Sequence, residues 1–115
     1  MNYDEFIAFI DAQEALFKSL RRPDESHRES VLANTVKISE EFGELCDAIL
    51  ESFGDQRKGK MDEHEEGDDE LRDELADVLI TVFLLAKRLD INVMDALERK
   101  ITKIHQKHNK EFRGE

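Results

Sequence analysis

Residues 78–86 constrain the fold more than any other segment, because they read Val-Leu-Ile-Thr-Val-Phe-Leu-Leu-Ala and carry no charge. A helix formed by this segment is apolar on nearly every side and must be covered on most of them. The rest of a 115-residue chain is too short to supply that cover alone. We therefore expect helices from two or more copies of the chain to pool into one bundle.

Helical periodicity extends over most of the chain. Apolar residues recur at the spacing of an amphipathic helix in four segments, which cover about residues 3–20, 29–53, 68–89 and 93–110. Ser26, with Glu29 three residues later, is typical of a helix start. Pro23 and Gly54 are stop signals after the first two segments. The sequence predicts an all-α fold, a four-helix chain that forms a helical bundle completed by oligomerisation.

The stretch from Gly54 to Gly67 is polar and shows no apolar periodicity. We interpret it as a loop rather than a linker between domains, because neither half of the chain could bury a core alone. Residues 1–115 are accordingly predicted to form a single domain.

Charge and cysteine content narrow the class of protein. A net charge of −11 argues against a protein that binds nucleic acid in a basic groove, although bound divalent ions would still permit nucleotides. The single cysteine, Cys46, cannot form an internal disulfide, which favours a reducing compartment. The first 20 residues are acidic, unlike a signal peptide, and the longest uncharged run is too short to span a bilayer. We expect a cytoplasmic protein without a nucleic-acid or membrane partner.

Two pairs of carboxylates, Glu41-x-x-Glu44 and Glu74-x-x-Asp77, are each spaced one helical turn apart in consecutive predicted helices. Each pair borders an apolar stripe, so an antiparallel hairpin would turn all four side chains into one cleft. Uncompensated carboxylates there repel one another and lose hydration, which a bound cation would offset. Oxygen ligands alone favour Mg²⁺, with Mn²⁺ as a substitute.

The apolar stripes beside these pairs are the predicted core faces. At about 100° per residue, the stripe of the second segment consists of Ile38, Phe42, Leu45 and Ile49. That of the third segment consists of Leu75, Leu79, Val82 and Ala86.

The two acidic motifs also resemble a known family. The segments Lys37-Ile-Ser-Glu-Glu-Phe-Gly-Glu-Leu and Glu74-Leu-Ala-Asp-Val-Leu are similar to the signature of the MazG-like, all-α nucleoside triphosphate pyrophosphohydrolases, and the likeness extends over about residues 31–107. It implies a helical dimer or tetramer that uses Mg²⁺ to hydrolyse a nucleoside triphosphate to the monophosphate and pyrophosphate. By position, the implied metal ligands are Glu41, Glu44, Glu74 and Asp77.

For the reaction, water is the expected nucleophile, oriented or deprotonated by Glu41 or Glu44, between which the sequence does not discriminate. In many relatives cationic residues late in the chain touch the triphosphate. The matching candidates are Lys100, Lys103 and Lys107, although cations are also common near an ordinary helix C-terminus. Lys37 is a further candidate, as a phosphate contact or as a counter-charge to Glu41.

Recognition of the base is poorly specified by the sequence. A stacking partner could come from the aromatic residues of the first two segments, although each also suits a core: Phe6, Phe9, Phe17, Phe42 and Phe53.

The main hypothesis is that the protein removes unwanted nucleoside triphosphates from the nucleotide pool. We considered three alternatives to it. The chain could be a non-enzymatic oligomeric helical interaction module whose acidic pairs only solubilise it. It could also keep the same fold and act on dUTP or on a phosphoribosyl nucleotide. A di-iron bundle is disfavoured, because no Glu-x-x-His pair occurs.

Overall fold

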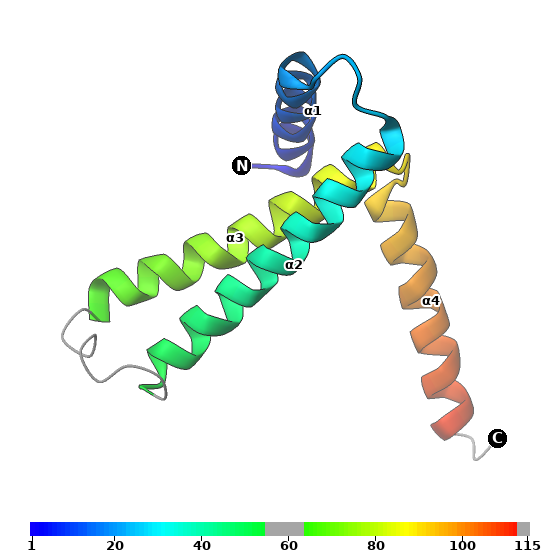
Figure 1. Ribbon diagram of the computed structural model, residues 1–115. Coiled ribbons are helices and arrows are strands. Elements are labelled where there is room, and N and C mark those ends of the chain that lie inside the picture. The colour runs from blue at the N-terminus through cyan, green and yellow to red at the C-terminus, as the bar shows by residue number, and fades with distance from the viewer. Residues whose placement is uncertain (55–63, 113–115) are drawn as a thin grey trace.

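The computed structural model describes the backbone of residues 1–54 and 64–112 and the side chains of these residues except 64–68 and 112. Within these ranges the chain forms helices and no strand, which confirms the all-α prediction (Figure 1). The helices are α1 (Tyr3–Leu20), α2 (His27–Ser52), α3 (His64–Arg88) and α4 (Val93–Phe112).

Side-chain caps determine where three of the helices begin. Oδ1 of Asn2 accepts a hydrogen bond from the backbone N–H of Glu5 at 2.9 Å. The predicted cap Ser26 accepts from Glu29 N–H at 3.1 Å, and Asn92 accepts from Asp95 N–H at 3.0 Å. Each bond satisfies one of the N–H groups left without a partner in the first helical turn. The Ser26 cap confirms the predicted start of α2, whereas Asn2 and Asn92 are caps that the sequence analysis did not identify.

The start of α3 corrects the predicted loop. We expected this helix to begin near residue 68 or 69, but it begins at His64, so residues 64–67 are helical. The periodicity criterion requires apolar residues, and this acidic first turn offers none, although negative charge there suits the helix dipole. The rest of the predicted loop, residues 55–63, lies outside the described residues.

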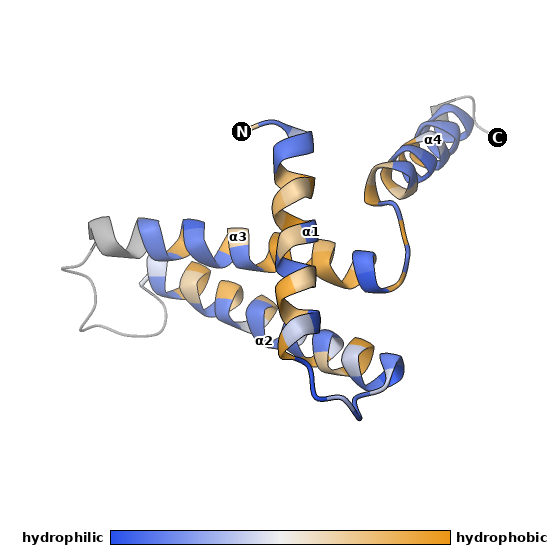
Figure 2. Cartoon of the chain, turned by 90° about the horizontal axis from the view of Figure 1, so that it is seen from above, coloured by the Kyte–Doolittle hydropathy of each residue, from blue (hydrophilic) through white to orange (hydrophobic). Residues whose placement is uncertain are grey.

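α2 and α3 lie side by side as an antiparallel hairpin, and α1 crosses the C-terminal half of α3 (Figure 1, Figure 2). The rings of Phe6 and Phe83 meet edge to face at this crossing, with centroids 4.9 Å apart. After Asp90, whose φ of 56° reverses the chain, α4 projects away from the other three helices. The hairpin and α1 are therefore the parts that can position a site within one chain.

The face of α2 that is buried in the chain is not the predicted core stripe. Its buried residues are Ser30, Asn34, Glu41 and Ala48, a row spaced by fours and sevens. The predicted stripe residues Phe42 and Ile49 are exposed, and so are Leu75, Leu79 and Val82 of α3. The prediction was wrong for a single chain, because hydrophobicity selects the most apolar row, whereas the hairpin packs through the neighbouring, more polar one.

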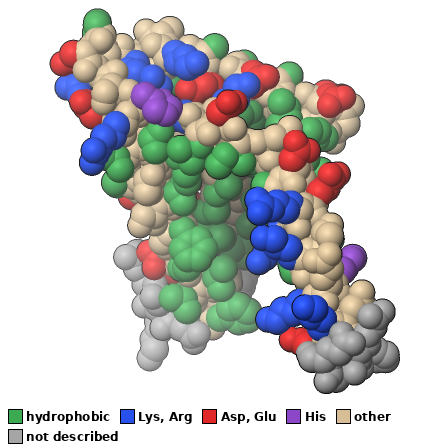
Figure 3. Space-filling model, turned by 90° about the vertical axis from the view of Figure 1, so that its right-hand side faces the viewer, with side chains coloured by type: hydrophobic (Ala, Val, Ile, Leu, Met, Phe, Trp, Pro, Cys, Tyr) green, Lys and Arg blue, Asp and Glu red, His purple; other side chains and the backbone are tan. Residues whose placement is uncertain are grey.

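Exposed apolar side chains consequently gather on one face. Figure 3 shows a continuous band of hydrophobic side chains beside α4, whose Lys and Arg side chains line the band's edge. Phe42 is 58% exposed and Leu79 is 50% exposed, values unusual for large apolar residues of paired helices. Among the described helices, none combines the length and apolar character needed to cross a bilayer.

A buried ion pair fastens α1 to the hairpin. Arg88 Nε lies 3.3 and 3.0 Å from the two carboxylate oxygens of Glu14, which is 3% exposed. Nη1 of the same arginine donates to the carbonyl of Ser30 at 3.3 Å, so one side chain joins three helices. Arg21 adds a second, longer contact to Glu14 at 3.7 Å.

Candidate metal centre

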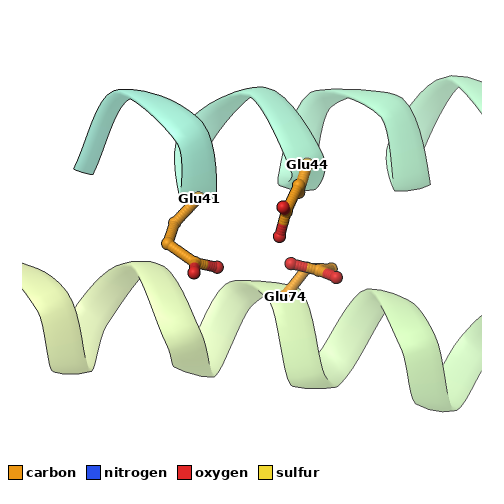
Figure 4. A group of neighbouring side chains, drawn as sticks. All are labelled: Glu41, Glu44 and Glu74. Atoms are coloured by element: carbon orange, nitrogen blue, oxygen red, sulfur yellow. The ribbon is translucent and has the colours of Figure 1, made fainter. Parts of the chain in front are cut away.

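Three carboxylates converge in the contact between α2 and α3. One oxygen each of Glu41, Glu44 and Glu74 lie within 4.8 Å of one another. Figure 4 shows the two α2 residues, one turn apart, pointing toward Glu74 on the facing helix. Glu41 is buried, Glu74 is half-buried and Glu44 is exposed, so the group has an enclosed side and an open side.

Asp77, the fourth residue of the predicted set, lies beside this group but not within it. It follows Glu74 by one turn of α3, and its side chain is exposed. Its backbone carbonyl accepts a hydrogen bond from the Thr81 hydroxyl at 2.7 Å, which anchors the backbone rather than the carboxylate. Asp77 as a metal ligand therefore stays a prediction.

The carboxylate cluster, meaning Glu41, Glu44 and Glu74, is electrostatically strained. Burial raises the pKa of Glu74 above its usual range, and the negative charges of Glu44, Asp77 and Glu41 raise it further. Oε2 of Glu41 and Oε2 of Glu74 are both buried without a hydrogen-bond partner among the described residues. Such oxygens are costly unless a cation or donor reaches them.

Lys37 supplies part of the missing positive charge. Its Nζ lies 3.1 Å from Oε1 of Glu41 and 3.8 Å from Glu40. The hydrogen bond and charge of Glu41 raise the pKa of Lys37, so the ammonium stays protonated. In the described part of the chain this lysine compensates one carboxylate, and no other cation forms an ion pair with the cluster.

The residues present fit a hard divalent cation. Oxygens bound at about 2.1 Å to an octahedral Mg²⁺ are about 3.0 Å apart when adjacent and about 4.2 Å apart when opposite. The three carboxylates, whose oxygens lie within 4.8 Å of one another, would reach these spacings by side-chain rotation. No histidine or cysteine belongs to the group, which disfavours zinc. The donor set suits Mg²⁺ or Mn²⁺.

The raised pKa of Glu74 makes two pH-dependent effects measurable. Between the ordinary glutamate pKa and the raised one, the folded protein holds a proton that the unfolded chain has released. Metal-free stability should therefore fall as pH rises through this window, while affinity for Mn²⁺ should rise because fewer protons compete. Calorimetric Mn²⁺ titrations across pH 4–8 test this. Glu74→Gln should weaken the dependence of Mn²⁺ affinity on pH. If that dependence were unchanged, groups other than Glu74 would cause it.

The predicted cationic residues of the last helix are not brought to the cluster within one chain. Lys100, Lys103 and Lys107 are exposed on α4, which projects away from the hairpin (Figure 1). Their predicted role in substrate binding therefore requires a second copy of the chain or a movement of α4.

A cavity that the sequence did not reveal adjoins the cluster. It has a volume of about 380 Å³, and Glu41 and Asp77 form part of its wall together with Asn34, Phe17 and residues of α3. A signal was present in the sequence: Asn34 precedes Glu41 by seven residues, two helical turns, on the same face of α2. From the sequence alone, without the geometry of the hairpin, Asn34 would be interpreted as an exposed polar residue.

An all-α hairpin that gathers carboxylates into a hard-cation donor set is compatible with metal-assisted hydrolysis of a phosphate anhydride. A family model described as MazG nucleotide pyrophosphohydrolase domain matches residues 29–112, and the chain belongs to this family.

One relative is a Bacillus subtilis (strain 168) protein described as uncharacterized protein YpjD, which is 32% identical over 76 residues. The match covers 66% of this chain and 65% of the relative, so the chain spans just under two thirds of that protein's length. No solved structure matches the chain significantly.

Proposed function

We propose that the protein hydrolyses (deoxy)nucleoside triphosphates to the monophosphate and pyrophosphate with Mg²⁺, and thereby removes unwanted nucleotides from the cytoplasmic pool. The observation that carries the proposal is the convergence of Glu41, Glu44 and Glu74 in a chain of the MazG family. Glu41 and Glu74 each have a buried oxygen without a hydrogen-bond partner among the described residues, as expected of side chains that bind a cation.

Glu41, Glu44 and Glu74 would hold the cation, and Asp77, one turn from Glu74 on α3, would be the fourth ligand. When bound, the cation supplies charge neutralisation and polarises the phosphoryl oxygens of the substrate. Mn²⁺ fits the same oxygen donors.

Of the two candidate bases, Glu44 is better placed to act on water. Glu41 is buried and paired with Lys37, whereas the Glu44 side chain is exposed on the open side of the cluster. In the proposed step, Glu44 accepts a proton from the water that attacks the α-phosphorus. The bond between the α-phosphorus and the bridging oxygen breaks, and pyrophosphate leaves with that oxygen.

Lys37 has a second role in this proposal. Its Nζ contacts Oε1 of Glu41 at 3.1 Å, so Oε2, the oxygen without a partner among the described residues, would remain for the cation. The exposed Lys37 ammonium also lines the cavity, where it can reach a substrate phosphate.

We also propose that the protein works as a homodimer or homotetramer. The exposed apolar residues Phe42, Leu79 and Val82 form faces that a second copy would bury. Such a partner would also supply Lys100, Lys103 and Lys107 to a site that lacks them within one chain.

Sedimentation should accordingly give a mass of at least twice 13.4 kDa. Leu79→Glu should dissociate the assembly, because a carboxylate would be buried in an apolar contact. Leu20→Glu, at the 73% exposed end of α1, is the matched control and should leave the mass unchanged. A monomeric wild-type protein would refute the oligomer.

The function itself is tested by incubating the purified protein with ribo- and deoxyribonucleoside triphosphates, dUTP and a phosphoribosyl nucleotide in Mg²⁺. Chromatography of the monophosphate and an enzymatic assay of pyrophosphate report the cleaved bond. Pyrophosphate release that disappears with a chelator is the expected result. Turnover restricted to dUTP or to the phosphoribosyl nucleotide would redefine the substrate. No turnover would favour the non-enzymatic helical module.

A further inference from the structure

The cavity beside the carboxylate cluster is built by three helices. Its lining includes Phe17 of α1, Asn34 of α2 and Thr81 of α3. Glu41 and Asp77 belong to the same lining, so a ligand in the cavity is continuous with one at the cluster. At about 380 Å³ it lies in the size range of small-molecule pockets.

Two residues of this cavity have a buried polar atom without a partner in the described part of the chain: Glu41, which belongs to the carboxylate cluster, and Asn34, which does not. Asn34 is only 6% exposed, and its Nδ2 donates a long hydrogen bond to the Thr81 carbonyl at 3.5 Å. Since a carbonyl only accepts, this contact turns the amide nitrogen toward α3. Oδ1 is then buried with no hydrogen-bond partner in the described part of the chain.

The neighbouring hydroxyl cannot satisfy this oxygen. Thr81 Oγ1 already donates its proton to the Asp77 carbonyl at 2.7 Å. A buried acceptor without a donor destabilises the fold, and a leucine would fill the same space without that penalty. An amide at this position is therefore better explained by a ligand that brings an N–H donor.

Phe17 supplies an aromatic surface at the same cavity. The residue is 39% exposed, so part of the ring remains available to a ligand. The Arg88 guanidinium lies 5.9 Å from the ring centroid, and Arg88 is itself held by Glu14. These contacts restrain the ring, and a restrained aromatic face suits stacking with a planar base.

The distance between Asn34 and Glu41 along α2 suits a nucleotide that extends from the carboxylate cluster into the cavity. Asn34 and Glu41 are seven residues apart, which is about 10 Å along a helix axis. A sugar lies between the α-phosphate and the base of a nucleotide, so the phosphates and the base need two sites separated in this way.

We propose that this cavity is the nucleobase pocket and that Asn34 determines which base it accepts. This inference rests on the proposed function. Asn34 Oδ1 accepts a hydrogen bond from an amino or ring N–H group of the base, while Phe17 stacks on its plane. The favoured substrates are nucleotides whose base places such a donor at Oδ1, and analogues with an acceptor or a methyl group there are rejected.

Binding of unphosphorylated nucleosides in the absence of metal isolates the pocket from the cluster. Calorimetry should detect binding of at least one natural nucleoside to the wild-type protein and equally to Glu44→Gln. Asn34→Leu and Phe17→Leu should each weaken it about tenfold. Thr35→Leu, an exposed neighbour on α2, is the matched control and should bind normally.

Turnover gives the second readout. Asn34→Leu should change the ratio of kcat/KM between nucleotides by about tenfold while thermal stability is unchanged or higher, because the unsatisfied oxygen is gone. Absence of nucleoside binding, or an equal loss of kcat/KM for all bases, would overturn the pocket while leaving pyrophosphate release intact. Nucleoside binding without any nucleotide hydrolysis would instead refute the proposed function.

Discussion

Glu44→Gln should lower Mg²⁺-dependent pyrophosphate release by about a thousandfold, since a cation that stabilises the transition state by several kcal/mol depends on its ligands. Glutamine keeps the size of the side chain and removes its negative charge. The same loss is expected for Glu41→Gln and Glu74→Gln, because one oxygen of each residue lies within 4.8 Å of the others. Initial rates at saturating nucleotide and Mg²⁺ measure the effect.

The fold should survive these substitutions. The pKa of Glu74 is raised by burial and by the charges of Glu44, Asp77 and Glu41, so the folded state carries repulsion that function rather than folding explains. Removing one charge should therefore raise metal-free thermal stability at neutral pH. Loss of stability in all three variants would contradict this assignment of the cluster.

Asp47→Asn is the matched control for charge. Asp47 is exposed on the same helix, one turn after Glu44, and lies outside the cluster. Its variant should hydrolyse nucleotides at the wild-type rate. Full activity in Glu44→Gln, or equal losses in Glu44→Gln and Asp47→Asn, would show that the cluster is not the metal site.

Arg88→Ala should destabilise the protein by about 3 kcal/mol, because it leaves a buried carboxylate without its main partner. Glu14 is 3% exposed, and after the substitution Arg21, at 3.7 Å, is its remaining ion-pair partner among the described residues. The Ser30 carbonyl also loses the donor that reaches it at 3.3 Å. A change of this size is a large fraction of the stability of an ordinary domain.

Urea denaturation followed by circular dichroism measures this effect, at one protein concentration for all variants because self-association would shift the midpoint. Lys87→Ala is the control, since Lys87 pairs with Asp11 at 2.7 Å across a half-exposed contact. It should cost less than about 1 kcal/mol. Equal costs for both variants would mean that the burial of Glu14 contributes nothing.

The helices themselves follow from local information. The predicted range of the first helix coincides with Tyr3–Leu20, and Ser26 caps α2 as expected. Periodicity and capping act over a few residues, so they are readable in a short window of sequence. The start of α3 was missed because its first turn at His64 has no apolar residue to mark a face.

The carboxylate cluster was predictable in part. Glu41 and Glu44 share a face of α2 by spacing alone, and an antiparallel partner brings Glu74 opposite to them. Asp77 has the same spacing from Glu74, but its side chain is exposed and lies outside the group. A spacing rule identifies the face of a helix, whereas the rotation of α3 against α2 decides which carboxylates meet.

The amino-acid sequence by itself determined the all-α class, the Ser26 cap and the two acidic motifs, because each depends on neighbours within a few residues. Only the tertiary structure decided that Arg88 pairs with Glu14, 74 residues earlier in the chain, and that Asn34 rather than Phe42 is buried. These outcomes depend on how whole helices rotate and cross. That choice is made by packing over all their contacts together, and no local pattern contains it.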